Sequence, residues 1–110
     1  MNNNRLERLF TFQKDSPNDP FILFAIAKEY EKLQDLDKAL EYYQRLTTNH
    51  ADYVGTYYHL GKLHEQLQQP SDAFFIYKKG MEMAKTAGDQ HALSELAGAK
   101  LMLGDDEDFE

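Results

Sequence analysis

The sequence predicts an all-α fold of antiparallel helical hairpins stacked one on the next. Residues 20–53 and 54–87 can be written as two copies of one 34-residue unit, and a fixed period of this length is typical of stacked helical hairpins. Within each copy, apolar residues recur at helical spacing. When one copy is shifted onto the other, small residues meet small residues and rings meet rings, as in Ala39 with Ala73 and Tyr43 with Tyr77.

The first two helices are expected over residues 3–14 and 20–33. The first helix has an apolar face that consists of Leu6, Leu9, Phe10 and Phe12. A single helix cannot bury such a face, so it must pack on the next helix. The second helix has a strong start, because Asp19 is a favoured N-cap and Pro20 loses no backbone donor at the first helical position.

The remaining helices are expected over residues 36–48, 53–67, 70–87 and 89–103. Pro70 suits a first helical position, and Gly88 suits the left-handed position that follows a helix end. We interpret residues 89–103 as a capping helix, because terminal repeats must cover the last apolar face. The prediction is therefore one domain over residues 1–103, followed by an acidic tail over residues 104–110.

The residues inside each copy follow a recognisable order. On the first helix a large residue precedes an aliphatic, a small residue and a ring, and on the second helix an Ala precedes a Tyr; the repeat positions are Leu23, Ala27, Tyr30, Ala39, Tyr43, Tyr57, Gly61, Ala73 and Tyr77. This pattern resembles the tetratricopeptide repeat (TPR) family. The resemblance implies a short right-handed superhelix, a TPR-like α-solenoid. Two departures concern the turns: Gln34 and Gln68 stand where the family often has Gly, and the closing Pro is absent after both copies.

The resemblance also implies a function, a non-catalytic protein-protein interaction module. In the family, one stripe of each first helix lines a concave groove that receives a peptide or a partner helix. Carried over, the candidate binding residues are Phe24, Lys28, Tyr58, His59, Lys62 and His91. Rings beside cations suit a ligand with apolar anchors and carboxylates. The alternative is that Phe24 and Tyr58 pack on neighbouring helices while the lysines are solvated.

Two further hypotheses concern self-association and the tail. Exposed apolar patches commonly mark association surfaces, so a terminal helix could make the chain a homodimer or a scaffold subunit. The acidic run from Gly104 to Glu110 carries one aromatic ring, Phe109. Such runs are usually solvated. Other hypotheses place it in the Lys28 and Lys62 groove of its own or a neighbouring chain, or make it a linker remnant.

Composition argues against several other classes of function. A net charge of −7 with 12 Lys plus Arg does not favour nucleic acid, whose phosphates need clustered cations. No apolar run approaches the roughly 20 residues of a membrane span, and the first residues do not resemble a signal peptide, so we expect a cytoplasmic protein. There is no Cys, and the four His do not converge. We expect no metal, no cofactor and no catalytic site.

Overall fold

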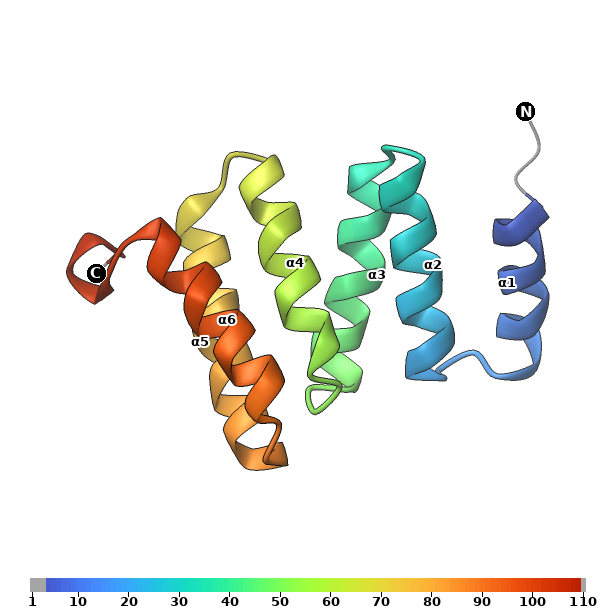
Figure 1. Cartoon of the computed structure of the whole chain (residues 1–110). Coiled ribbons are helices and arrows are strands. Elements are labelled where there is room, and N and C mark those ends of the chain that lie inside the picture. The colour runs from blue at the N-terminus through green and yellow to red at the C-terminus, as the bar shows by residue number, and fades with distance from the viewer. Residues whose placement is uncertain (1–3, 110) are drawn as a thin grey trace. The chain divides into compact units, whose positions relative to one another are not determined.

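The computed structural model describes residues 4–109, which form six α-helices and a short 3-10 helix but no strand (Figure 1). The all-α fold of helical hairpins is therefore confirmed. Residue 3, where the first helix was expected to begin, and Glu110 lie outside the described residues. The chain divides into two compact units at His50 and Ala51.

The first unit contains helices α1 (Asn4–Asp15), α2 (Pro20–Lys32) and α3 (Leu36–Asn49). Helices α2 and α3 pack side by side as an antiparallel hairpin (Figure 1). Their facing sides bury Leu23, Ile26, Ala27, Ala39, Tyr43 and Leu46. The small residues Ala27 and Ala39 are fully buried, as is the larger Tyr43 ring.

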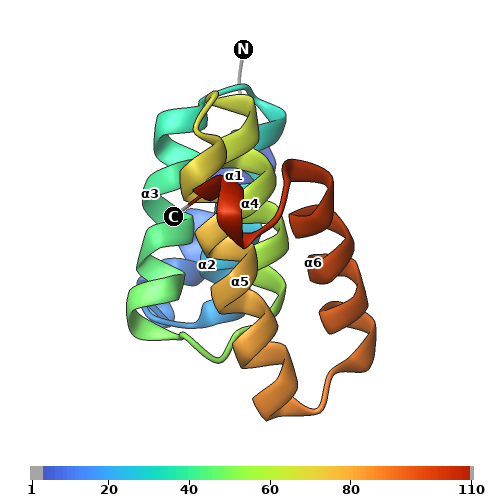
Figure 2. The same ribbon diagram turned by 90° about the vertical axis from the view of Figure 1, so that its left-hand side faces the viewer.

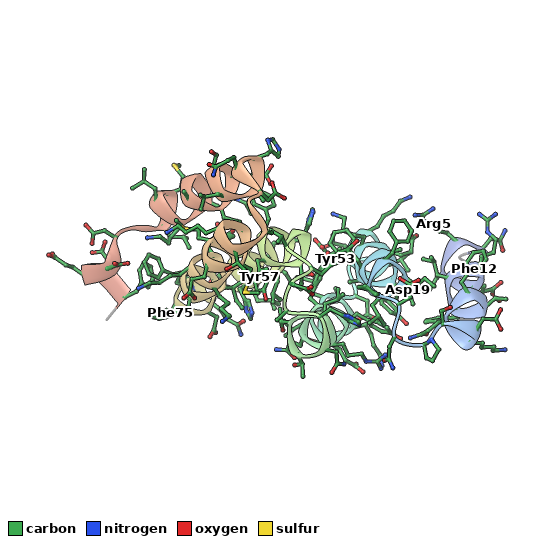
Figure 3. All side chains as sticks on the ribbon, turned by 90° about the horizontal axis from the view of Figure 1, so that it is seen from below. Arg5, Phe12, Asp19, Tyr53, Tyr57 and Phe75 are labelled. Carbon is green, nitrogen blue, oxygen red and sulfur yellow. The ribbon has the colours of Figure 1, made fainter. Side chains whose placement is uncertain are left out.

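Helix α1 packs on α2 through partly exposed side chains. The Phe10 ring lies 6.4 Å from the Tyr30 ring, between centroids, and Arg5 reaches toward α2 (Figure 3), with its Nε 3.1 Å from the Glu29 carboxylate. No residue of α1 is buried. Phe12 is 58% exposed, so the expectation that the whole apolar face of the first helix packs on the next helix is wrong at this ring.

The second unit contains α4 (Gly55–Gln66), α5 (Pro70–Ala87), α6 (Gln90–Leu103) and the 3-10 helix η1 (Asp106–Phe109). Helix α5 packs against both α4 and α6 (Figure 2). The core of this unit consists of Tyr57, Ala73, Tyr77, Ala84, Leu96 and Ala99. The acidic tail, expected to be solvated, instead contacts α5 and α6 through Asp106 and Phe109.

Helices α2 and α5 begin where the sequence predicts, whereas α4, expected from residue 53, begins at Gly55 and has no side-chain cap. Asp19 accepts a hydrogen bond from the Phe21 N–H (2.9 Å) ahead of Pro20, and Pro70 is the first residue of α5. Gly88 ends α5 with a φ of 70°, a left-handed conformation that costs Gly little. The extension of one domain over residues 1–103 stays a prediction.

The two turns that lack the family's Gly still close in the same way. Gln34 and Gln68 both adopt positive φ, 63° and 60°. After α2 the Asp35 N–H donates to the Tyr30 carbonyl (2.9 Å), and after α4 the Gln69 N–H donates to the His64 carbonyl (2.8 Å). This is the Schellman pattern, in which a left-handed residue lets the chain satisfy the last helical carbonyls.

Candidate interaction surface

One contact recurs in both hairpins and ties the second helix to the first. The Tyr43 hydroxyl donates to the Glu31 carboxylate, and the Tyr77 hydroxyl donates to the Glu65 carboxylate. Both tyrosine rings are buried. Burial first, and then the hydrogen bond to Glu, raises the pKa of each tyrosine. Each phenol therefore keeps its proton as a donor and holds one carboxylate in place on the first helix.

In the first unit, the candidate residue Phe24 contacts the tyrosine of this pair, and the candidate residue Lys28 lines a depression together with its glutamate. The half-buried Phe24 ring meets the Tyr43 ring edge-on, with 6.0 Å between centroids. Lys28 is exposed and lines a shallow depression whose other residues are Arg5, Glu29, Glu31 and Lys32. Phe24 thus packs on its own hairpin, as the alternative interpretation holds, and still keeps part of its ring accessible.

In the second unit, three candidate residues on α4 lie together with the repeated carboxylate. The Lys62 Nζ lies 5.5 Å from the Tyr58 ring centroid and 3.7 Å from the Glu65 carboxylate. His59 meets the Tyr58 ring edge-on at 5.7 Å, and the Tyr77 ring lies 6.5 Å from Tyr58. Tyr58, His59, Lys62 and Glu65, which we call the α4 cluster, present two rings, a cation and a carboxylate on one helix.

His91 occupies a different position, at the start of α6. Its side chain is 90% exposed and its Nε2 lies 3.9 Å from the Glu95 carboxylate, one helical turn further along. A histidine so exposed is held mainly by its own helix. The binding role of His91, like that of the other candidate residues, stays a prediction.

Glu31 on α2 and Glu65 on α4 are the residues whose hydrogen bonds were not predicted from the sequence. Both glutamates and both tyrosines keep the 34-residue spacing, and each Tyr follows its Glu by 12 residues. That shared spacing was the available signal. A hairpin turn between the two helices is what brings residues so far apart in sequence to hydrogen-bonding distance.

The chemistry of these helix faces suits binding. The cation–π contact of Lys62 with Tyr58 and the carboxylates fixed by phenols offer complementary charge and apolar area to a ligand. Among residues 4–109, no group of three or more His, Asp or Glu side chains is placed to hold a metal ion. In that same part of the chain, no helix is both long and apolar enough to cross a membrane.

Comparison with known proteins identifies relatives of both hairpins. The family model of the tetratricopeptide repeat matches residues 22–49 and 54–86. A tetratricopeptide repeat domain protein from Salinibacter ruber, solved by NMR, is 45% identical, with a TM-score of 0.78 over 80% of this chain and 89% of that chain. A crystal structure of such a protein from the same organism is 44% identical, with a TM-score of 0.75 over 84% and 99%.

The fold is also found at lower sequence identity. The solution structure of a protein from Bordetella parapertussis is 22% identical, with a TM-score of 0.79 over 100% of this chain and 95% of that chain. At this identity the likeness concerns the fold alone. No curated protein matches the chain.

Proposed function

Because the chain belongs to the tetratricopeptide repeat family, whose repeats generally mediate protein–protein interaction, we propose that it is a non-catalytic module that binds a peptide segment or helix of a partner protein. The binding faces are those of the first helix of each hairpin, α2 and α4, with the start of α6 as an addition. Each unit contributes its own copy of the same chemistry.

The observation that carries this proposal is the repeated placement of a ring, a lysine and a tyrosine-bound glutamate on one helix face. In the α4 cluster the Lys62 ammonium lies near both the Tyr58 ring and the Glu65 carboxylate. A lysine held in this way loses less side-chain freedom when it binds a carboxylate of the partner. The exposed part of the Tyr58 ring supplies apolar contact area of the kind that anchors peptides.

The proposal predicts which charges the partner needs. Affinity capture from the native source with the wild-type chain should retain a protein partner that a Lys28→Glu, Lys62→Glu variant fails to retain. A matched variant, Lys79→Glu with Lys85→Glu, makes the same change in net charge at exposed positions of α5 and should retain it. Circular dichroism checks that helicity is equal in all three. Identical capture profiles for the two variants would contradict the proposal.

A second candidate function is self-association through α1, as a homodimer. The observation that favours it is the exposed Phe12 ring on a helix that buries none of its residues, since an exposed apolar ring is a common element of association surfaces. Light scattering at tens of micromolar should then give a dimer mass for the wild type and a monomer mass for Phe12→Ser. A monomer mass for both would exclude this function at that concentration.

A further inference from the structure

The C-terminal segment Gly104–Phe109 lies against α5 and α6. The Phe109 ring stacks on the Phe74 ring, with 4.4 Å between centroids and 19° between planes. The Asp106 carboxylate lies 3.8 Å from the Lys78 Nζ and 3.6 Å from the Lys100 Nζ. One ring and one carboxylate therefore hold the segment to the two helices.

The surface beneath the tail has a definite chemistry of its own. Phe74 is 1% exposed, and the Lys100 Nζ lies 4.7 Å from the centroid of its ring. Lys78 follows Phe74 by one helical turn on α5. A phenyl ring with one ammonium group beside it, and a second lysine one helical turn away, is complementary to a segment that carries an aromatic ring and a carboxylate close together. We call the face formed by Phe74, Lys78 and Lys100 the α5–α6 site.

The tail reaches this site as a compact turn. The Asp105 N–H donates to the Asp108 carboxylate (2.9 Å), and the Glu107 N–H donates to the Asp105 carboxylate (3.2 Å). Gly104 has a φ of 147°, and a Cβ there would lie 2.6 Å from the Asp108 Oδ2, so a side chain at this position would disturb the turn. The turn brings Asp106 and Phe109, which are three residues apart, onto the same surface.

We propose that the α5–α6 site is a second binding site, distinct from the α2 and α4 faces, for an acidic segment of a partner protein in which Phe follows Asp by three residues. The chain's own tail occupies the site as a tethered competitor. A partner segment with this chemistry binds by displacing the tail. The partner therefore binds only above the concentration at which it outcompetes the tail.

The contacts indicate how the tail and a partner compete. Asp106 is more than half exposed, as is Lys78, whereas Lys100 is 20% exposed. Because the shared carboxylate is exposed to water, both ion pairs contribute little and weaken with salt. The stacked ring of Phe109 is therefore the anchor. A ligand joined by a short linker acts at an effective concentration on the order of millimolar. A free peptide binds well only when Phe109 no longer fills the site.

The test uses the full chain and a fluorescein-labelled peptide with the sequence of residues 104–109. By fluorescence anisotropy, a Phe109→Ala chain should bind this peptide at least about fivefold more tightly than the wild type does, because the tethered competitor is weakened. Phe109→Ala is a release variant, because it weakens the contact that holds the tail in the site. A second release variant, Asp106→Lys, should likewise bind the peptide more tightly than the wild type does. A peptide in which the Phe is replaced by Ala should not bind.

Substitutions in the site distinguish specific peptide binding from non-specific attraction between the acidic peptide and surface lysines. In the Phe109→Ala background, Lys100→Ala should reduce peptide affinity severalfold, whereas the neighbouring Lys79→Ala should leave it unchanged; circular dichroism shows whether each variant is folded. The proposal fails if no peptide binds to either release variant, if wild type and release variants bind equally, or if Lys79→Ala has the same effect as Lys100→Ala. It also fails if the wild type instead forms dimers that Phe109→Ala abolishes, since the site would then accept the tail of a second copy.

Discussion

The hairpin of α2 and α3 and the hairpin of α4 and α5 keep the same surface contacts over different cores. Both have the Tyr–Glu hydrogen bond and the left-handed Gln turn. In the first core, Leu23 and Leu46 are fully buried, whereas the aligned residues of the second are Tyr57 and Gly80. A Cβ at Gly80 would lie 2.5 Å from the Tyr57 Cβ. The second hairpin thus fits a larger residue on one helix by removing a side chain from the other.

A second exchange concerns the small residue next to the repeated tyrosine. Ala27 is fully buried beside the hairpin interface of the first unit. At the aligned Gly61, a Cβ would lie 2.1 Å from the Tyr77 Cε1. The Tyr77 ring therefore lies directly on the α4 backbone. Aligned positions therefore lie at the same helix–helix contact in both hairpins, but their side chains differ in volume. Each core must be close-packed with its own set of side chains.

The largest expected effect comes from giving the second hairpin the core pair of the first. Gly80→Leu should destabilise the chain by at least about 3 kcal/mol, because the added side chain overlaps Tyr57 in a packed core. Tyr57→Leu should cost about 3 kcal/mol through the cavity it leaves, together with the lost hydrogen bond from the Tyr57 hydroxyl to the Ala51 carbonyl.

The double variant tests whether the two positions compensate. If they form a size-matched pair, its destabilisation should be smaller than the sum of the single effects by about 0.5 to 3 kcal/mol, the usual range for residues in contact. Urea unfolding of the four chains measures this. Leu96 also lies 3.1 Å from the Cβ position of Gly80, so the rescue should be partial. Strict additivity would show that the exchange does not explain the difference between the hairpins.

A smaller effect is expected when the second hairpin receives the alanine of the first. Gly61→Ala should destabilise by about 2 kcal/mol, because the new methyl group must displace the Tyr77 ring; this outweighs the gain in helix propensity, about 1 kcal/mol, that Ala brings over Gly. Thermal unfolding followed by circular dichroism measures the change. The control is Gly98→Ala on α6, where nothing lies within 4 Å of the Cβ position, and which should stabilise the helix. Stabilisation by both variants would contradict the close contact of Tyr77 with α4.

The shared Tyr–Glu hydrogen bond should contribute equally to the stability of both hairpins. Tyr43→Phe and Tyr77→Phe should each cost about 1.5 kcal/mol, the typical worth of a hydrogen bond to a charged acceptor. Denaturant unfolding at neutral pH measures both. Unequal costs would show that the contact is structural in one hairpin and incidental in the other.

The same pair gives a dependence on alkaline pH. Folding raises the pKa of Tyr43 and Tyr77 above the ordinary value of 10.0, so the folded state holds these protons more tightly than the unfolded state. Their contribution is fully present below pH 10 and is lost as the pH rises above it. The double Tyr→Phe variant should therefore lose less stability between pH 10 and pH 11 than the wild type does. An equal loss would show that these two phenols do not cause the loss of stability at alkaline pH.

The sequence predicted the parts of the fold that depend on local patterns and on the repeat. Capping residues and helical spacing indicated the helices, and the 34-residue register indicated the small and aromatic positions. The role of Gly80 was not predictable in this way, because its aligned residue is Leu46 and the two copies share no small residue there. The stacking of Phe109 on Phe74 joins residues that no repeat relates, and the exposure of Phe12 depends on how much surface α2 offers. Such contacts are set by three-dimensional packing.

The smallest expected effect tests whether the two Gln turns carry the same strain. A non-Gly residue in the left-handed conformation costs roughly 1 to 2 kcal/mol, part of which Gly returns through greater freedom of the unfolded chain. Gln34→Gly and Gln68→Gly should therefore each stabilise by about 0.5 kcal/mol, as measured by the urea midpoint. The control is Gly88→Ala, where φ is 70° and nothing lies within 4 Å of the Cβ position, and which should destabilise by about 1 kcal/mol. If Gln34→Gly were destabilising while Gln68→Gly were not, the Gln34 side chain, whose Nε2 donates to the Glu31 carbonyl at 3.2 Å, would be the cause, and the two turns would not be equivalent.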